Sequence, residues 1–290
     1  MAERRGRWTL LEVLEWTRGH FAAKGVENPR LDAEVLLAHV LETERVMLYA
    51  RFDQPMAPDE LAKMRQLVAR RAAGVPVAHL VGRREFWSLD LVVTADVLVP
   101  RPETEELAVR LIDSAFAQNA GDRLADIGTG SGCLALALAQ ARPQAVVYGS
   151  DIDSDALSLA AENARQTGLQ ARVRWLQGDL LQPFAPRSLH AVVSNPPYVC
   201  EAEYRRLPLH IRGREPRRAL CAGSDGLAAL RPLIAGAAET LTPGGRIALE
   251  IGEDQGPAVA GLLQQAGFRS IEIARDLAGR TRFALARRPC

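Results

Sequence analysis

From Arg123 to the C-terminus, short β-rich runs alternate with helical segments. The expected strands are residues 124–127, 145–148, 173–176, 191–193 and 247–251, followed by 270–274 and 282–286. Expected helices follow the first glycine turn and cover 156–166, 227–241 and 258–266. This alternation predicts a parallel sheet with helices on both faces, which is a doubly wound α/β domain. The last two runs have no helix between them, so we expect them to pair as an antiparallel hairpin at one end.

The N-terminal part follows a different pattern. Residues 10–73 have helical spacing of apolar side chains and no strand-like alternation. Gly25 is expected to end a first helix, Asn28 and Pro29 to begin a second over 31–41, and a third to follow Pro58. We predict a helical bundle over 1–75, a linker over 76–102 and the α/β domain over 103–290. Within the linker, residues 86–93 and 97–99 are expected to form a β-hairpin around a turn at 94–96.

Charge and composition exclude several classes of protein. The formal net charge of the 290-residue chain is +1, which argues against binding nucleic acid by bulk neutralisation of phosphates. No apolar run reaches the roughly 18 residues of a membrane span, and the N-terminus lacks the apolar core of a signal peptide. The four cysteines have no metal-ligand spacing, so we expect no metal site. A cytoplasmic protein is therefore expected.

A glycine-rich turn should lie between the first strand and the first helix of the α/β domain. It consists of Gly128, Thr129, Gly130, Ser131 and Gly132. Glycines let the backbone approach a ligand closely, and the following helix offers free N–H groups. The same residue types also serve in simple turns, and dinucleotide enzymes use a related motif.

Two acidic residues strengthen the case for a nucleoside-containing cofactor. Asp151 ends the second expected strand, where a carboxylate can accept both hydroxyls of a ribose. Asp179 follows the third strand and could accept from the exocyclic amine of adenine. The carboxyl ends of parallel strands share one edge of the sheet, so these groups should face one crevice.

The tetrad Asn195, Pro196, Pro197 and Tyr198 follows the fourth expected strand. The two prolines stiffen the backbone and supply no N–H of their own. The Asn195 side chain and the Pro196 carbonyl could accept both hydrogens of a substrate NH2 group, while Tyr198 packs against the planar group. The nitrogen lone pair could then face an electrophilic methyl on a sulfonium. A rigid, purely structural turn is the alternative.

The order of glycine turn, acidic residue and Asn-Pro-Pro-Tyr resembles the class I amino-methyltransferases that use S-adenosyl-L-methionine. That family has a seven-stranded sheet ending in an antiparallel hairpin. Nearly the whole chain looks like one of its members, the release factor glutamine methyltransferase family. The similar stretches are 76–80 with Gly82, 85–87, 99–105, 215–216 with 219–220, 223–227, 250–252 and 275–280.

The resemblance implies methylation of the glutamine side-chain nitrogen in the Gly-Gly-Gln motif of class I peptide-chain release factors, with S-adenosyl-L-homocysteine as the other product. It places the donor on residues 128–132 and Asp151, with Asp179 and Leu180 beside its adenine and Asn195 also in contact with it. Asn195 to Tyr198 would hold the glutamine amide, and Leu98 would line the pocket. Arg214 stands where the family usually has an aromatic residue.

Some alternatives stay open. Arg101 and Glu103 could lie at the rim of the substrate cleft, or Glu103 and Glu105 could simply favour the first turn of a helix. The substrate could instead be a ribosomal protein or an exocyclic amine of nucleic acid, although the stretch 276–280 favours the release factor. An NAD-dependent oxidoreductase or a non-catalytic binding module would leave the tetrad unexplained. We expect a monomer that contacts neither membrane nor nucleic acid.

Overall fold

The computed structural model describes residues 7–113 and 121–290, which divide into two compact units. One unit runs to Gly82 and includes Leu209–Arg214. The other comprises Arg83–Pro208 and Glu215–Cys290. The predicted linker, residues 76–102, is thus divided between the two.

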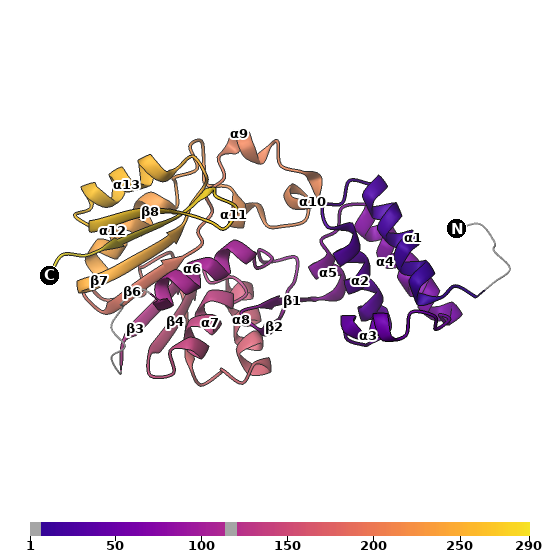
Figure 1. Ribbon diagram of the computed structural model, residues 1–290. Helices are drawn as coiled ribbons and strands as arrows, with labels where there is room; N and C mark the ends of the chain where they lie inside the picture. Colours follow the sequence, from indigo (N-terminus) through magenta and orange to yellow (C-terminus); the bar gives the residue numbers. More distant parts are fainter. Residues whose placement is uncertain (1–6, 114–120) are drawn as a thin grey trace. The chain divides into compact units, whose positions relative to one another are not determined.

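The first unit is a bundle of helices (Figure 1). The helices expected near residues 10–23, 31–41 and after Pro58 are confirmed, and Gly25 follows the first with a φ of +73°. Pro29 occupies the first turn of the second helix, although the side chain of Asn28 makes no capping hydrogen bond. Three short helices, α3, α5 and α10, were not predicted. Among the described residues, the bundle contains α1 (Leu10–Ala23), α2 (Pro29–Val40), α3 (Arg45–Ala50), α4 (Pro58–Ala72), α5 (Val77–Val81) and α10 (Leu209–Arg212).

The second unit contains a seven-stranded sheet in the order β5-β4-β3-β6-β7-β9-β8. Neighbouring strands are parallel except that β9 runs antiparallel to both β7 and β8, which confirms the expected hairpin at one end. From β3 the chain moves outward through β4 to β5 and then returns to the other side of β3 with β6. The strands are β3 (Arg123–Ile127), β4 (Val146–Asp151), β5 (Val173–Gln177), β6 (Leu189–Ser194), β7 (Leu241–Glu250), β8 (Arg269–Arg275) and β9 (Thr281–Arg287).

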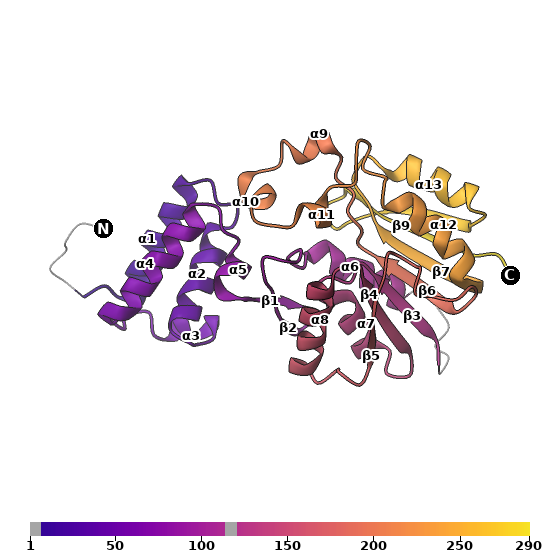
Figure 2. The same ribbon diagram turned by 180° about the vertical axis from the view of Figure 1, so that it is seen from behind.

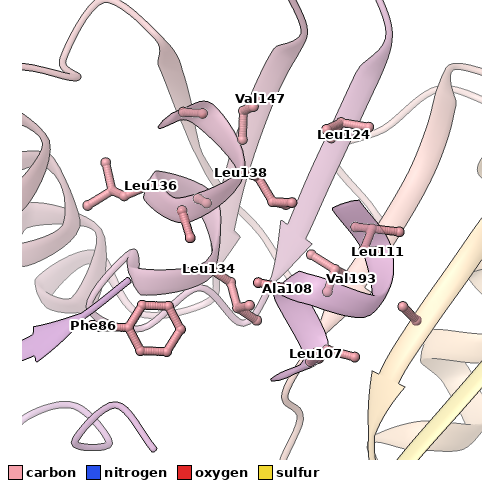
Figure 3. Close-up of a cluster of buried hydrophobic side chains, with 14 of the residues drawn as sticks. Phe86, Leu107, Ala108, Leu111, Leu124, Leu134, Leu136, Leu138, Val147 and Val193 are labelled. Atoms are coloured by element: carbon pink, nitrogen blue, oxygen red, sulfur yellow. The ribbon is translucent and has the colours of Figure 1, made fainter. Parts of the chain in front are cut away.

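Helices cover both faces of the sheet, and the central strand β3 is buried on both sides. Leu124 of β3 packs toward one face and its neighbour Ala125 toward the other. The first face is covered by α6 (Pro102–Asp113), α7 (Cys133–Ala141) and α8 (Ser154–Gln166). Figure 3 shows the apolar side chains of α6 and α7 against the sheet. The second is covered by α12 (Leu230–Thr240) and α13 (Gly256–Gln265), seen from behind in Figure 2. Short helices α9 (Glu201–Tyr204) and α11 (Arg217–Leu220) lie between β6 and α12.

The position of the predicted hairpin was wrong. The hairpin pairs β1 (Arg83–Phe86) with β2 (Leu89–Val92), and its turn is Trp87 and Ser88. Both turn residues have positive φ, a conformation for which hairpins usually use Asn and Gly, so Trp87 and Ser88 carry no recognisable turn signal. A carboxylate oxygen of Glu105 holds this turn by accepting from the Trp87 N–H at 3.2 Å. The segment 97–99 belongs to no strand.

Asn163 of α8 joins the edge of this hairpin to the glycine-rich turn. Its side chain accepts from the Val92 N–H at 2.8 Å, donates to the Val92 carbonyl at 3.0 Å and donates to the Ser131 carbonyl at 2.9 Å. The residue is fully buried and out of reach of water, so these three bonds supply the hydrogen-bond partners that its polar atoms need.

We predict that Asn163→Ala lowers the free energy of unfolding by about 3–5 kcal/mol, because it leaves buried backbone groups without partners. Urea unfolding followed by tryptophan fluorescence measures the change. Ser158→Ala, an exposed change on the same helix, serves as the control and should have little effect. Equal stabilities for the two variants would contradict this role of Asn163.

Candidate active site

A cavity of about 510 Å³ lies at the carboxyl ends of β3, β4, β5 and β6. It is next to β3, where the chain reverses its order of strands, which is the usual ligand position in a doubly wound sheet. Most of the predicted site residues line it, namely Leu98, Arg101, Gly128, Thr129, Gly130, Ser131, Asp151, Asp179, Leu180, Asn195 and Pro197.

Four predicted site residues do not line the cavity. Gly132 caps α7 with a φ of +83°, and a Cβ there would come within 3.0 Å of Ala160 and Trp175, so this glycine serves close packing. Pro196 is buried. Glu103 forms an ion pair with Arg280 at 3.0 Å. The fourth residue, Tyr198, directs its hydroxyl into a buried network described below.

The glycine turn is shaped to admit a ligand. Gly128 and Gly130 have φ values of +71° and +54°, and a Cβ on either would meet no other atom within 4 Å, so the backbone faces open space. The Gly130 N–H donates to one oxygen of Asp151 at 2.9 Å, and the Asp153 N–H donates to the other at 3.0 Å. Asp151 is thereby held beside the turn. A bare backbone next to a positioned carboxylate fits a ribose-containing group.

Asp126 lies beneath the glycine turn. It is not among the predicted site residues. Its carboxylate accepts from the Thr129 hydroxyl at 2.6 Å and from the Ala135 N–H at 3.1 Å. Burial raises the pKa of Asp126 to about 7, although both hydrogen bonds lower it. The carboxylate therefore ties the turn to the first helical residues behind it.

Asn195 faces the cavity and begins a chain of buried hydrogen bonds. Its Nδ2 donates to the Thr104 Oγ1 at 3.1 Å, and the Thr104 hydroxyl donates to the Glu250 Oε2 at 2.7 Å. The Tyr198 hydroxyl donates to the Glu250 Oε1 at 3.1 Å and accepts from the Arg282 Nη1 at 3.3 Å. Burial raises the pKa of the Glu250 carboxyl and, together with the nearby Glu250 charge, that of the Tyr198 hydroxyl.

Two arginines hold the rim of the cavity. Arg101 donates to Glu215 at 2.6 Å, and the Glu215 side chain is only 1% exposed. Burial raises the pKa of Glu215, and the Arg101 charge opposes that shift. Arg218 of α11 donates to Asp153 and to the Asp96 carbonyl. Both pairs join the segment after β6 to other walls of the same cavity.

Thr104 and Glu250 were missed as site residues. Both belong to stretches that carried the family resemblance. Thr104 stands between Glu103 and Glu105, and only these two glutamates were considered for a role at the site. The available signal for Glu250 was its position at the end of a strand, which it shares with Asp151. Within residues 7–113 and 121–290, no cluster of three or more His, Cys, Asp or Glu side chains could hold a metal ion. In the same residues, no helix combines the length and apolar character needed to cross a membrane.

Comparisons with known proteins agree with this architecture. The model of the PrmC N-terminal domain matches residues 12–82, and that of the methyltransferase small domain matches residues 106–207. A methyltransferase from Pyrococcus furiosus shares the fold with a TM-score of 0.54 and 18% identity, over 78% of this chain and 98% of that one. The hMettl16 catalytic domain, solved with an RNA hairpin, gives a TM-score of 0.56 and 17% identity over 77% and 80%.

The fold and the cavity at its switch point define a methyltransferase of class I, for which S-adenosyl-L-methionine is the methyl donor. The curated relatives narrow this class. The release factor glutamine methyltransferase of Moorella thermoacetica is 47% identical over 97% of this chain and 99% of its own length. That of Geobacter sulfurreducens is 44% identical over 95% of each chain. The chain belongs to the release factor glutamine methyltransferase family.

We predict that Asp126→Asn changes how stability depends on pH. The folded-state pKa of Asp126 is raised above the ordinary 3.8, so the folded protein binds more protons than the unfolded chain between about pH 4 and pH 7. The contribution of this group is therefore fully present in acid and is lost as the pH rises through the folded-state pKa. The amide does not titrate, and its oxygen can still accept from Thr129 and Ala135.

The free energy of unfolding is measured in urea for both proteins from pH 5 to pH 8. The value for the variant minus the value for the unchanged protein should increase as the pH rises. The unchanged protein supplies the control at each pH. Parallel curves would mean that Asp126 is not buried as an ionisable group.

Proposed function

We propose that this chain transfers a methyl group from S-adenosyl-L-methionine to the side-chain amide nitrogen (N5) of the glutamine in the Gly-Gly-Gln motif of class I peptide-chain release factors. The family membership supports the reaction, since relatives of 40–47% identity carry that name. The observation that carries the proposal is the position of Asn195 in the cavity wall, with its nitrogen engaged by Thr104 and its oxygen left for a substrate.

The open backbone of the glycine turn and the strand-end carboxylate fit the donor. Residues 128–131, which line the cavity, would hold its methionine part, and Gly132 would support the turn by close packing. Asp151 would hold the ribose, and Asp179 with Leu180 the adenine. When bound, the donor supplies an electrophilic methyl group on a sulfonium centre. The chain itself contributes the position of these groups around the cavity.

The substrate amide would meet two acceptors on the tetrad. The Asn195 Oδ1, in the cavity wall, would accept one hydrogen of the glutamine NH2 group, and the Pro196 carbonyl would accept the other, although Pro196 is buried and does not itself line the cavity. The two bonds would orient the nitrogen and favour a tetrahedral geometry. Leu98, Arg101 and Pro197 line the cavity and would bound the planar amide, and Tyr198 would support them from the buried network. Glu103 would act indirectly from the rim through its ion pair. No general base is required, because the proton can leave after the nitrogen is alkylated.

We further propose a cytoplasmic, monomeric enzyme whose helical bundle, residues 1–75, docks the release factor, while residues 103–290 carry the reaction. A formal net charge of +1 supports a protein partner over nucleic acid. An assay with labelled methyl groups tests the substrate by offering a release factor, a ribosomal protein and nucleic acid in parallel. Label in the Gly-Gly-Gln glutamine, located by mass spectrometry, is expected. Label only in ribosomal protein or nucleic acid would refute the proposal.

We predict that Asn195→Ala lowers kcat by about 10²–10³-fold, because it removes one of two groups that orient the reacting nitrogen. The affinity for S-adenosyl-L-methionine, measured by calorimetry, should change little. An equal loss of cofactor affinity and turnover would show that Asn195 holds the donor and not the acceptor.

We predict the opposite order of effects for Asp151→Ala. The loss of a charged hydrogen-bond acceptor should raise the Kd for S-adenosyl-L-methionine about 10–100-fold. At saturating donor, kcat should fall much less. Asp155→Ala, four residues on and exposed, is the matched control and should bind the donor normally. A normal Kd for Asp151→Ala would remove this residue from the cofactor site.

A further inference from the structure

When Glu250 is ionised, the buried hydrogen bonds behind Asn195 have only one self-consistent direction. Arg282 can only donate, so the Tyr198 oxygen accepts from it and the Tyr198 hydrogen points to Glu250. An ionised Glu250 can only accept, so the Thr104 hydroxyl also donates to it. The oxygen of Thr104 is then free to accept, and the group it accepts from is the Asn195 NH2.

This direction decides which atom Asn195 offers to the cavity. The oxygen and the NH2 group of a carboxamide have nearly the same size, so packing alone does not distinguish them. With the Nδ2 bound to Thr104, the Oδ1 is the atom left for the substrate. The reversed carboxamide would present N–H donors in the same place.

The two orientations suit two different substrates. An oxygen accepts from the NH2 group of a glutamine, whereas an outward NH2 group donates to the oxygen of a glutamate. A site built to pair one polar group discriminates strongly against an analogue that leaves that group unpaired. The orientation of Asn195 therefore bears on the choice between an amide and an acid.

We propose that Glu250 and Thr104 are positioning residues that hold the Asn195 carboxamide with its oxygen toward the substrate and thereby give the enzyme its preference for a carboxamide over a carboxylate. The identity of the substrate rests on the proposed function, whereas the orientation of Asn195 rests on the hydrogen bonds alone. Thr104 comes from α6 and Glu250 from the end of β7, and both are buried, at 2% exposure each.

The orientation of Asn195 also depends on the ionisation of Glu250. The charged or titratable groups around it are Arg282, Tyr198, Glu103 and Cys133. Burial raises its pKa and Glu103 adds to the shift, while Arg282 lowers it. A proton on the Oε2 would reverse the bond to Thr104 and release the Asn195 nitrogen. The preference for the amide should therefore grow as the pH rises and Glu250 ionises.

A purely structural network makes a different prediction. In that case Thr104, Glu250, Arg282 and Tyr198 would only connect α6, β7, β9 and the tetrad. Their loss would lower stability and activity toward any substrate by the same factor, and the ratio between an amide and an acid would stay constant.

The test compares Thr104→Val with Thr104→Ser in the full chain. Valine keeps the shape of the side chain and removes the hydroxyl, whereas serine keeps the hydroxyl. The probes are a class I release factor carrying Gly-Gly-Gln and the same factor carrying Gly-Gly-Glu, the second used as a competitive inhibitor. Calorimetry with S-adenosyl-L-methionine checks that each variant keeps its cofactor site.

We predict that Thr104→Val reduces the preference for the glutamine factor about tenfold, corresponding to one hydrogen bond of about 1.4 kcal/mol, and lowers kcat. Thr104→Ser should restore the preference. Glu250→Gln should show the reduced ratio at every pH, whereas the ratio of the unchanged enzyme increases with pH. An unchanged ratio in Thr104→Val would overturn the proposal.

A second measurement needs no substrate. Hydrogen exchange of the Asn195 NH2 protons is followed by NMR, with their signals assigned by their absence from Asn195→Ala. One proton should be protected in the unchanged protein and in Thr104→Ser, and exposed in Thr104→Val. Fast exchange of both protons in the unchanged protein would refute the orientation even if release factor is methylated. Protection without methylation of any release factor would leave the orientation standing and refute only the proposed substrate.

Discussion

Carboxylates at the ends of parallel strands organise this site, and two of the three, Asp126 and Glu250, are buried whereas Asp151 is half-buried. Asp126, Asp151 and Glu250 lie at or next to the last residues of β3, β4 and β7, and each accepts hydrogen bonds from segments that follow or face the sheet. Removing such a group from water is unfavourable unless donors replace the water. The donors here are backbone and hydroxyl groups of the loops after the strands and of helices α6 and α7. The interactions that compensate for removing these acids from water therefore also hold the loops and helix ends in position.

Much of the fold could be predicted because its signals are local. The alternation of strand and helix, the glycines with positive φ and the missing helix between β8 and β9 are each visible within a few residues. The hairpin was displaced because its turn, Trp87 and Ser88, depends on a tertiary contact. Glu105 lies 18 residues away in the sequence and accepts from the Trp87 N–H. Intrinsic turn preferences do not reveal such a contact.

The same distinction explains which parts of the site were found. Asn195 and Asp151 occupy strand ends and sit in recognisable motifs, and the structure brings both to one cavity. Thr104 lies 91 residues before Asn195 in the sequence, and Glu250 lies 146 residues after Thr104. No spacing pattern connects residues that are so far apart. Their roles depend on the direction of each hydrogen bond, which only the folded arrangement defines.

The polar network behind Asn195 has a function that an apolar core could not perform. Apolar side chains of similar size could fill the space between α6, β7 and β9, often with equal or greater stability than a buried ion pair provides. An apolar filling would leave the Asn195 carboxamide free to turn over, because nothing would distinguish its two ends. A donor-only guanidinium at one end and an acceptor-only carboxylate in the middle impose a direction on Tyr198 between them and on Thr104 and Asn195 beyond them. Such a network sacrifices packing stability for the orientation of one side chain, the one that we propose contacts the reacting nitrogen.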